Sequence, residues 1–254
     1  MLHEGQAARG ANEIASGLYK YLMNLRPDIR HITMYSDSCQ GQNKNSHMAV
    51  MCMIALQDNT NLLSISHKFL IPGHTHMECD SDHSLIEKKK KKYSLPISHP
   101  RDWAQLVRVT GKKRPFLVTE LSTADFFDFS SLLKQDLILR KSDMKGEKIF
   151  WRDIQWLHFE KGNLGTFDFK TSLLNEPFRT VSFRRIGRQM GKLVPNAGYN
   201  GPNPIAVEKK KDLLDLLPFI SETFWEFYRG LNTCPSVRNI LPDVVENGDG
   251  DGDD

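Results

Sequence analysis

The sequence lacks a long apolar run and a leader-like start, and it has few cysteines. Its longest purely apolar run covers residues 48–56, which is nine residues, whereas a helix that spans a bilayer needs about 20. The first residues, MLHEGQAARGANEIAS, contain no basic segment followed by an apolar one, so they do not resemble a secretory signal. We therefore expect no transmembrane helix. We also expect the four cysteines to be reduced thiols, namely Cys39, Cys52, Cys79 and Cys234.

Three motifs of nucleotide-binding proteins and hydrolases are also absent. The sequence contains no GxxxxGK[ST], no GxGxxG and no GxSxG, which argues against a P-loop, a Rossmann phosphate loop and a nucleophile elbow. The composition is that of a globular protein, with 254 residues, of which 39% are hydrophobic and 26% charged. These proportions exclude a disordered or fibrous chain.

The modest net charge of +3 conceals an asymmetry along the chain. The last twelve residues hold six acids and no base, so residues 1–242 carry a net charge of +9. Lysines cluster within this basic part at residues 88–92 and 209–211. The excess is compatible with a polyanionic partner.

The N-terminal part alternates predicted helices and strands. Apolar residues recur at helical spacing over residues 11–25, and Pro27 ends that helix. We predict a strand at residues 31–35, a buried helix at 44–57, a strand at 62–71 and a helix from His76 to about Lys92, with Thr75 and Glu78 forming a capping box. This order predicts an α/β half-domain with a parallel strand pair covered by helices.

The remaining residues give weaker signals, typical of an α+β annex. They predict strands near residues 116–121, 148–151, 166–169 and 179–184, a helix at 124–133 and a final helix at 209–231, interrupted at Pro218. The tail is rich in Gly and Asp and is expected to be disordered. We therefore divide the chain into an α/β part at 1–97, an annex at 98–242 and a tail at 243–254.

Carboxylates lie where a parallel sheet places its ligands, beyond the carboxyl ends of the strands. Asp37 follows the first predicted strand, and the helix after the second strand starts at the same edge of the sheet. His76, Asp80, His83 and Glu87 are spaced by four, three and four residues, so they share one face of that helix. Oxygen ligands of this kind can hold Mg²⁺, and two such ions can activate water at a phosphate.

Each of these features also has a purely structural interpretation. Asp37 can be a turn or cap acid before the helix at 44–57, and Asp80 and Glu87 can belong to a solvated helix face. His74, His76, Cys79 and His83 are zinc-ligand types, although a paired-cysteine knuckle is missing. The lysine cluster can solubilise a helix end or bind a phosphate backbone. The four tryptophans are scattered without basic neighbours, which favours core packing.

Several stretches together resemble a known family. They are RGANEIAS at residues 9–16, YSDSCQGQN at 35–43, PGHTHMECDSDH at 72–83 and the Ile-Glu pair at 86–87, with looser matches at Trp151 and KDLL at 211–214. They resemble a transposase-derived domain of the ribonuclease-H-like DDE superfamily, in a family of unknown function found in animal genomes. The resemblance implies that Asp37 is the second acid of the site and Asp80 the third, with Glu87 in reserve.

One departure from that family changes the expectation. The sequence opens at what resembles the first helix of that fold, so we expect the three strands that carry the first acid to be absent and Glu4 to be no strand acid. The chain is therefore expected to be a partial ribonuclease-H-like domain, N-terminally truncated, in which the strand at 31–35 has an unpaired edge that invites association, including homo-oligomers.

The resemblance implies a transposase-like function. The complete form would cleave and rejoin DNA with Mg²⁺ or Mn²⁺, whereas this truncated chain would be inactive. Asp37 and Asp80 would bind metal, His83 or His76 would orient a ligand, and the backbone phosphates would be bound by Lys88, Lys89, Lys90, Lys91 and Lys92. We expect a nuclear location, otherwise a cytoplasmic one. The alternative is a domesticated, non-catalytic module that binds nucleic acid or protein.

Overall fold

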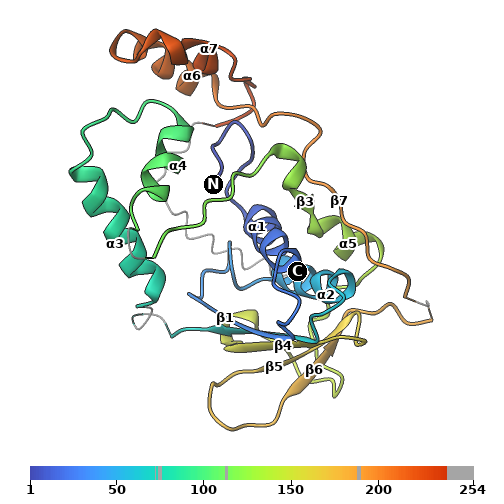
Figure 1. Ribbon diagram of the computed structural model, residues 1–254. Coiled ribbons are helices and arrows are strands. Elements are labelled where there is room, and N and C mark those ends of the chain that lie inside the picture. Colours follow the sequence, from blue (N-terminus) through green and yellow to red (C-terminus); the bar gives the residue numbers. More distant parts are fainter. Residues whose placement is uncertain (72, 74–75, 112–113, 188–189, 239–254) are drawn as a thin grey trace.

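A five-stranded mixed sheet forms the centre of the molecule (Figure 1). The structure is a computed structural model that describes residues 1–71, 73, 76–111, 114–187 and 190–238. In spatial order the strands are β1 (His31–Ser36), β2 (Ser64–Phe69), β4 (Trp156–Glu160), β5 (Thr166–Lys170) and β6 (Arg179–Ser182). β1 and β2 are parallel, and the other neighbours are antiparallel. The predicted α/β class and the parallel pair are confirmed.

The crossover between the parallel strands is α2 (Ser46–Asp58). Every side chain from Met48 to Leu56 is buried, which explains why the sequence is apolar all round this helix. Asn45 caps the start of the helix, because its side-chain oxygen accepts a hydrogen bond from the Met48 amide at 3.0 Å. The apolar run of the sequence is thus a core helix between two parallel strands.

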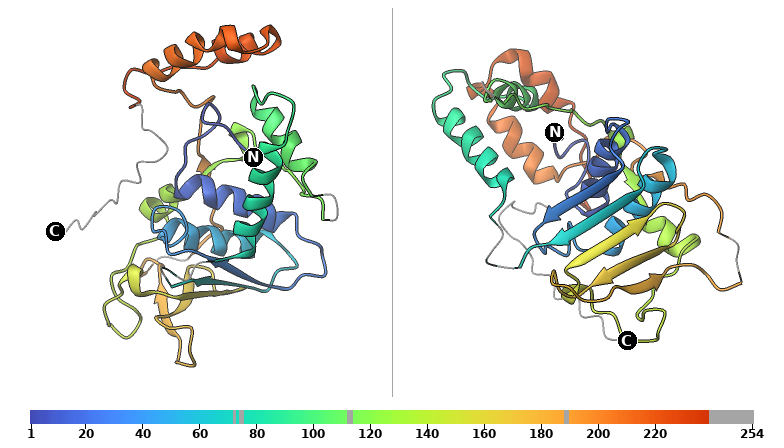
Figure 2. Two further views of the ribbon diagram at one scale, coloured as in Figure 1. Left: turned by 90° about the vertical axis from the view of Figure 1, so that its left-hand side faces the viewer. Right: turned by 60° about the horizontal axis from the view of Figure 1, so that its bottom comes forward.

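The helices that pack on the sheet cover one of its faces. α1 (Ala11–Met23) lies against α2, and α5 (Phe129–Gln135) also contacts α2. In Figure 2 these helices lie on one side of the sheet, and the opposite face carries no described helix. Ile65, Phe69, Leu157, Phe159 and Phe169 point toward the helices and are buried. The next residues along each strand therefore face the open side.

The sheet unites the two parts into which the sequence was divided at residue 97. β1 and β2 come from the first part, whereas β4, β5 and β6 come from the second. β5 and β6 lie where strands were predicted, but β4 was not predicted. Residues 116–121 form no strand, and Trp151–Asp153 form a 3₁₀ helix (η2) in place of part of a predicted strand. The predicted strands at residues 116–121 and 148–151 were therefore wrong.

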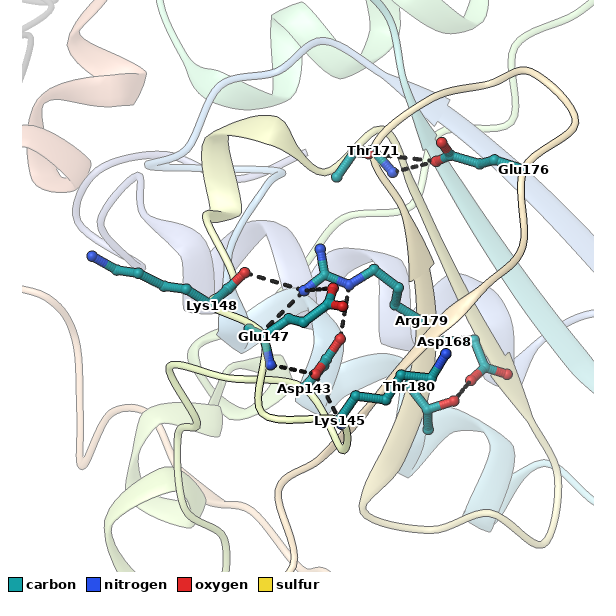
Figure 3. A network of polar contacts seen from close by, with 9 residues as sticks. All are labelled: Asp143, Lys145, Glu147, Lys148, Asp168, Thr171, Glu176, Arg179 and Thr180. Carbon is teal, nitrogen blue, oxygen red and sulfur yellow. Dashed lines mark hydrogen bonds and ion pairs between the residues drawn. The ribbon is translucent and has the colours of Figure 1, made fainter.

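A polar contact fastens the loop before η2 to β6 (Figure 3). Arg179 donates from Nε to the Asp143 carboxylate at 2.8 Å, and the Asp143 side chain is only 2% exposed. The second oxygen of Asp143 accepts the backbone amides of Lys145 and Glu147, both at 2.9 Å. Arg179 also donates to the Lys148 carbonyl at 3.1 Å. This loop is therefore held by one nearly buried ion pair with its hydrogen bonds satisfied.

The predicted helix at 124–133 is broken into smaller elements. Thr123–Asp125 form a 3₁₀ helix (η1), β3 (Phe127–Asp128) pairs with β7 (Asn196–Ala197), and α5 follows. Asp128 caps α5 by accepting the amides of Ser130 and Ser131 at 3.0 and 3.2 Å. The cap explains why the helix begins only at Phe129.

Two helices, α3 (Glu78–Lys91) and α4 (Pro100–Arg108), contact each other. α3 starts two residues later than predicted, and Thr75 of the predicted capping box lies outside the described residues. Figures 1 and 2 show α3 beside the sheet, and none of its side chains is buried. The parallel strands are therefore covered by α1 and α2 and not by α3.

The predicted final helix is divided into several short elements. They are α6 (Val207–Asp215), the 3₁₀ helices η3 (Leu217–Phe219) and η4 (Glu222–Phe224), and α7 (Trp225–Arg229). Pro218 stands in η3, at the predicted interruption. No helix in the described part of the chain is long and apolar enough to cross a membrane. The acidic tail at 243–254 lies outside the described residues.

Candidate functional site

Asp37 lies directly after β1, in the loop that leads to α2. Its carboxylate accepts hydrogen bonds from the Asn43 side-chain amide at 2.7 Å and from the Cys39 backbone amide at 3.2 Å. The Ser38 hydroxyl donates to the Leu70 carbonyl at 3.0 Å, so the loop lies beside the end of β2, as the parallel pairing predicts. Asp37 is half-buried and organises this turn.

Two buried polar residues next to this loop were missed by the sequence analysis. His67 of β2 is 2% exposed, and its Nε2 lies 2.8 Å from the hydroxyl of Ser36, the residue before Asp37. Burial lowers the pKa of His67 to about 4, so the imidazole is neutral at neutral pH. Lys44 is 3% exposed, and its ammonium donates to the Arg152 carbonyl at 2.5 Å. Burial lowers the pKa of Lys44.

Asp80 is the third residue of α3, and its side chain caps the start of the helix. Its carboxylate accepts the Met77 backbone amide at 2.7 Å, which satisfies a donor at the start of the helix. His76 Nδ1 lies 3.8 Å from the same oxygen, and both side chains are well exposed, His76 at 85% and Asp80 at 48%. The local role of Asp80 is thus the stabilisation of the helix N-terminus, where a negative charge is favourable.

The other residues of the predicted helix face remain in solvent. His83 and Glu87 are exposed on α3, as is Cys79 of the zinc interpretation, and within the described residues none of these three side chains has a hydrogen bond or ion pair with Asp37. His74, part of the zinc interpretation, lies outside the described residues. Among the residues that the structure does describe, no three His, Cys, Asp or Glu side chains come together as a metal site.

The lysine segment, which we define as Lys88, Lys89, Lys90, Lys91 and Lys92, ends α3. Four of these residues are exposed and Lys89 is half-buried. The Lys90 ammonium lies 4.9 Å from the ring centroid of Trp103 on α4, a cation–π distance. Cations at a helix C-terminus are stabilised by its dipole. The arrangement presents a dense positive charge on a helix that projects from the body (Figure 1).

The tryptophans are less buried than core packing predicts. Trp103, Trp151, Trp156 and Trp225 are all half-buried. Trp156 stands on the open face of the sheet, between two lysines of neighbouring strands, Lys68 and Lys170. The basic neighbours that the linear sequence lacks are therefore supplied by strand pairing, which sequence spacing does not reveal.

Comparison with protein families gives one match. The model of the family described as Domain of unknown function (DUF7869) matches residues 5–155. The chain belongs to this family. The DUF7869 region runs from the segment before α1 to the residue before β4, so it contains Asp37, α3 and the lysine segment. No curated protein matches the chain, and no solved structure matches it.

Proposed function

We propose that this chain is a DNA-binding module of a transposase-derived protein and that it does not cleave DNA by itself. The observation that carries the proposal is the lysine segment at the end of α3. This helix has no buried side chain, so packing of the helix does not require five adjacent lysines. A dense positive charge on an exposed helix is suited to contacts with backbone phosphates, which dominate the affinity of proteins for DNA.

The environments of the acids support a non-catalytic role for the chain alone. Asp80 uses its carboxylate to cap α3, and Asp37 uses its carboxylate to hold a turn. Each role needs one acid and no metal. With no described group of three ligands, we derive no metal-dependent step for this chain.

A second candidate function is Mg²⁺- or Mn²⁺-dependent DNA cleavage and strand transfer in a form that supplies a further strand and a further acid. Two observations favour it: Asp37 stands at the carboxyl end of a parallel strand, and β1 is an edge strand of the described sheet. A ribonuclease-H-like strand could pair with that edge. Asp37 and Asp80, with Glu87 in reserve, would then be the ligands from this chain.

Partners and location follow from the proposed DNA binding. In the described sheet β1 is an edge strand, and this edge can pair with a second copy of the chain. We therefore propose two kinds of partner, DNA and a second copy of the same chain. With DNA as the partner we propose a nuclear location, otherwise a cytoplasmic one. The division into an α/β part and an annex at residue 97 stays part of this proposal.

The binding test compares two variants that lose the same charge. In the α3 triple variant, Lys88, Lys91 and Lys92 are replaced by Gln. The control triple variant replaces Lys134, Lys141 and Lys145, which are exposed lysines elsewhere. We expect the α3 variant to bind a labelled DNA duplex about tenfold more weakly or worse at low salt, and the control to bind like the wild type. Equal affinities for all three proteins would refute the proposal.

The cleavage test uses supercoiled plasmid with Mg²⁺ or Mn²⁺. We expect this chain to leave the plasmid intact. Metal-dependent nicking that is abolished in Asp37→Asn would contradict the non-catalytic interpretation and support the second candidate. In the binding interpretation, Asp37→Asn leaves DNA affinity unchanged or raises it, because the substitution removes a negative charge.

A further inference from the structure

A row of alternating aromatic and lysine side chains crosses the open face of the sheet. Tyr35 of β1 pairs with Lys68 of β2, Lys68 pairs with Trp156 of β4, and Trp156 pairs with Lys170 of β5. Phe178, directly before β6, packs edge-on against Trp156 with ring centroids 5.2 Å apart. We call these five residues the aromatic–lysine row. The right-hand view of Figure 2 shows the strands of this face in front of the helices.

The distances within the row define its order. The Lys68 ammonium lies 3.9 Å from the Trp156 ring centroid and 5.8 Å from that of Tyr35. The Lys170 ammonium lies 4.9 Å from the Trp156 centroid and 4.4 Å from that of Phe178. Each positive charge therefore stands between two rings, in contact distance for cation–π attraction.

The two ammonium groups of the row have no carboxylate partner in the described part of the chain. Within the described residues no carboxylate lies in ion-pair distance of Lys68 or Lys170, and neither ammonium has a hydrogen-bond acceptor there. Lys170 is only 7% exposed, and its ammonium lies against the rings of Trp156 and Phe178. A nearly buried lysine without a counter-ion favours an anionic ligand.

The rings at the two ends of the row are open to solvent. Tyr35 is 56% exposed and Phe178 is 38% exposed. Exposed rings on a sheet surface stack on unpaired bases, and interleaved cations bind the phosphates between them. Adjacent strands are about 4.8 Å apart, so the row from β1 to β5 is about 14 Å long, enough for roughly two or three nucleotides.

The neighbouring row on the same face is polar and already paired. Ser66 Oγ lies 2.9 Å from His158 Nδ1, and Thr180 donates to Asp168 at 2.6 Å, as Figure 3 shows for the second pair. Glu160 at the far end of β4 is exposed and lies 3.5 Å from His158. The aromatic–lysine row thus presents rings and lysine ammonium groups, whereas the polar side chains of the neighbouring row are already hydrogen-bonded to each other. Of the two rows, the aromatic–lysine row is therefore the one suited to bind a ligand.

We propose that the aromatic–lysine row binds single-stranded DNA, with Tyr35 and Phe178 stacking on bases and Lys68 and Lys170 contacting phosphates. The choice of DNA rests on the proposed function, but the surface differs from the lysine segment of α3. The lysine segment carries no exposed ring, so it is suited to duplex backbone, whereas the row requires unpaired bases.

The test measures binding of a fluorescent oligo(dT) of about 15 nucleotides by anisotropy. We expect Tyr35→Ala and Phe178→Ala each to weaken binding about tenfold, and Tyr35→Phe to bind like the wild type because the ring remains. Lys68→Gln is expected to lower the salt slope by about 0.7. Tyr21→Ala is the matched control, because Tyr21 is 62% exposed on α1. Circular dichroism of each variant checks the fold.

The outcomes separate this inference from the proposed function. The α3 triple variant should lose duplex binding and keep its preference for oligo(dT), whereas Tyr35→Ala should do the reverse. Equal affinity of wild type and Tyr35→Ala for oligo(dT) would overturn the inference even if α3 binds duplex. Tighter binding of oligo(U) RNA than of oligo(dT) would overturn the assignment to DNA, and duplex competing as well as single strand would overturn the role of the rings.

Discussion

The imidazole Nε2 of His67 lies 2.8 Å from the hydroxyl of Ser36, so a buried histidine joins the ends of the two parallel strands. The ring also packs against Phe69, with ring centroids 4.3 Å apart. Its Nδ1 is buried and has no partner among the described residues. The histidine is therefore accommodated in the core only in its neutral form.

This environment predicts an acid-sensitive fold. Burial lowers the pKa of His67 from 6.5 to about 4, so the unfolded chain binds a proton that the folded chain excludes. The contribution of neutral His67 to the free energy of unfolding is fully present above about pH 6.5. As the pH falls toward 4, this contribution is lost, and the free energy of unfolding decreases by about 3 kcal/mol. In urea unfolding at a series of pH values, the free energy of unfolding of His67→Met should decrease by about 3 kcal/mol less than that of the wild type between about pH 6.5 and 4. The same pH dependence in both proteins would contradict it.

The role of Asp37 in its turn predicts a modest change in stability. Asp37→Ala removes the acceptor of two hydrogen bonds, so we expect a loss of about 1 to 2 kcal/mol in chemical denaturation. Asp37→Asn keeps a side-chain oxygen and should lose less than half of that. If both variants are as stable as the wild type, the acid does not hold the turn.

The cap at the start of α3 predicts a local effect. Asp80→Ala should speed hydrogen exchange in the first turn of α3 several-fold, because an N-cap contact contributes about 1 kcal/mol. Global stability should change little, since α3 has no buried side chain. Adding Mg²⁺ should leave the exchange of wild-type α3 unchanged. Protection of α3 by Mg²⁺ that requires Asp80 would point to a metal ligand instead.

The sheet core predicts a large global effect at Phe159. This side chain is 1% exposed and lies with its ring centroid 5.5 Å from that of Phe167. Phe159→Ala should lower the free energy of unfolding by about 3 to 5 kcal/mol. Phe219→Ala is the control, because Phe219 is 85% exposed and its loss should cost less than about 0.5 kcal/mol. Similar losses for both would contradict the assignment of β4 to the core.

The elements with strong local patterns could be predicted from the sequence. The apolar run at 48–56 is a buried helix, and the two strands beside it are parallel. β4 was missed although residues 157–160 alternate between apolar and polar side chains and Gly162 and Asn163 follow the strand, because an alternation of only four residues is a weak pattern. Its place beside β2 depends on a contact between distant segments.

The candidate site was predicted only in its local parts. Asp37 lies at the expected edge, but α3, which carries Asp80, His83 and Glu87, has no apolar stripe to pack on a sheet. That absence was the signal that α3 stays exposed. The row of Tyr35, Lys68, Trp156 and Lys170 could not be found from spacing, because strand register brings its members together.

The most direct test of DNA binding through the lysine segment is the slope of log K against log salt for a DNA duplex. It is measured for the wild type, for the variant with Gln at positions 88, 91 and 92, and for the control with Gln at 134, 141 and 145. We expect the α3 variant to have a slope shallower by about 2.7, that is, about 0.9 for each lost phosphate contact, and the control to match the wild type. The same slope in all three proteins would contradict the proposed function.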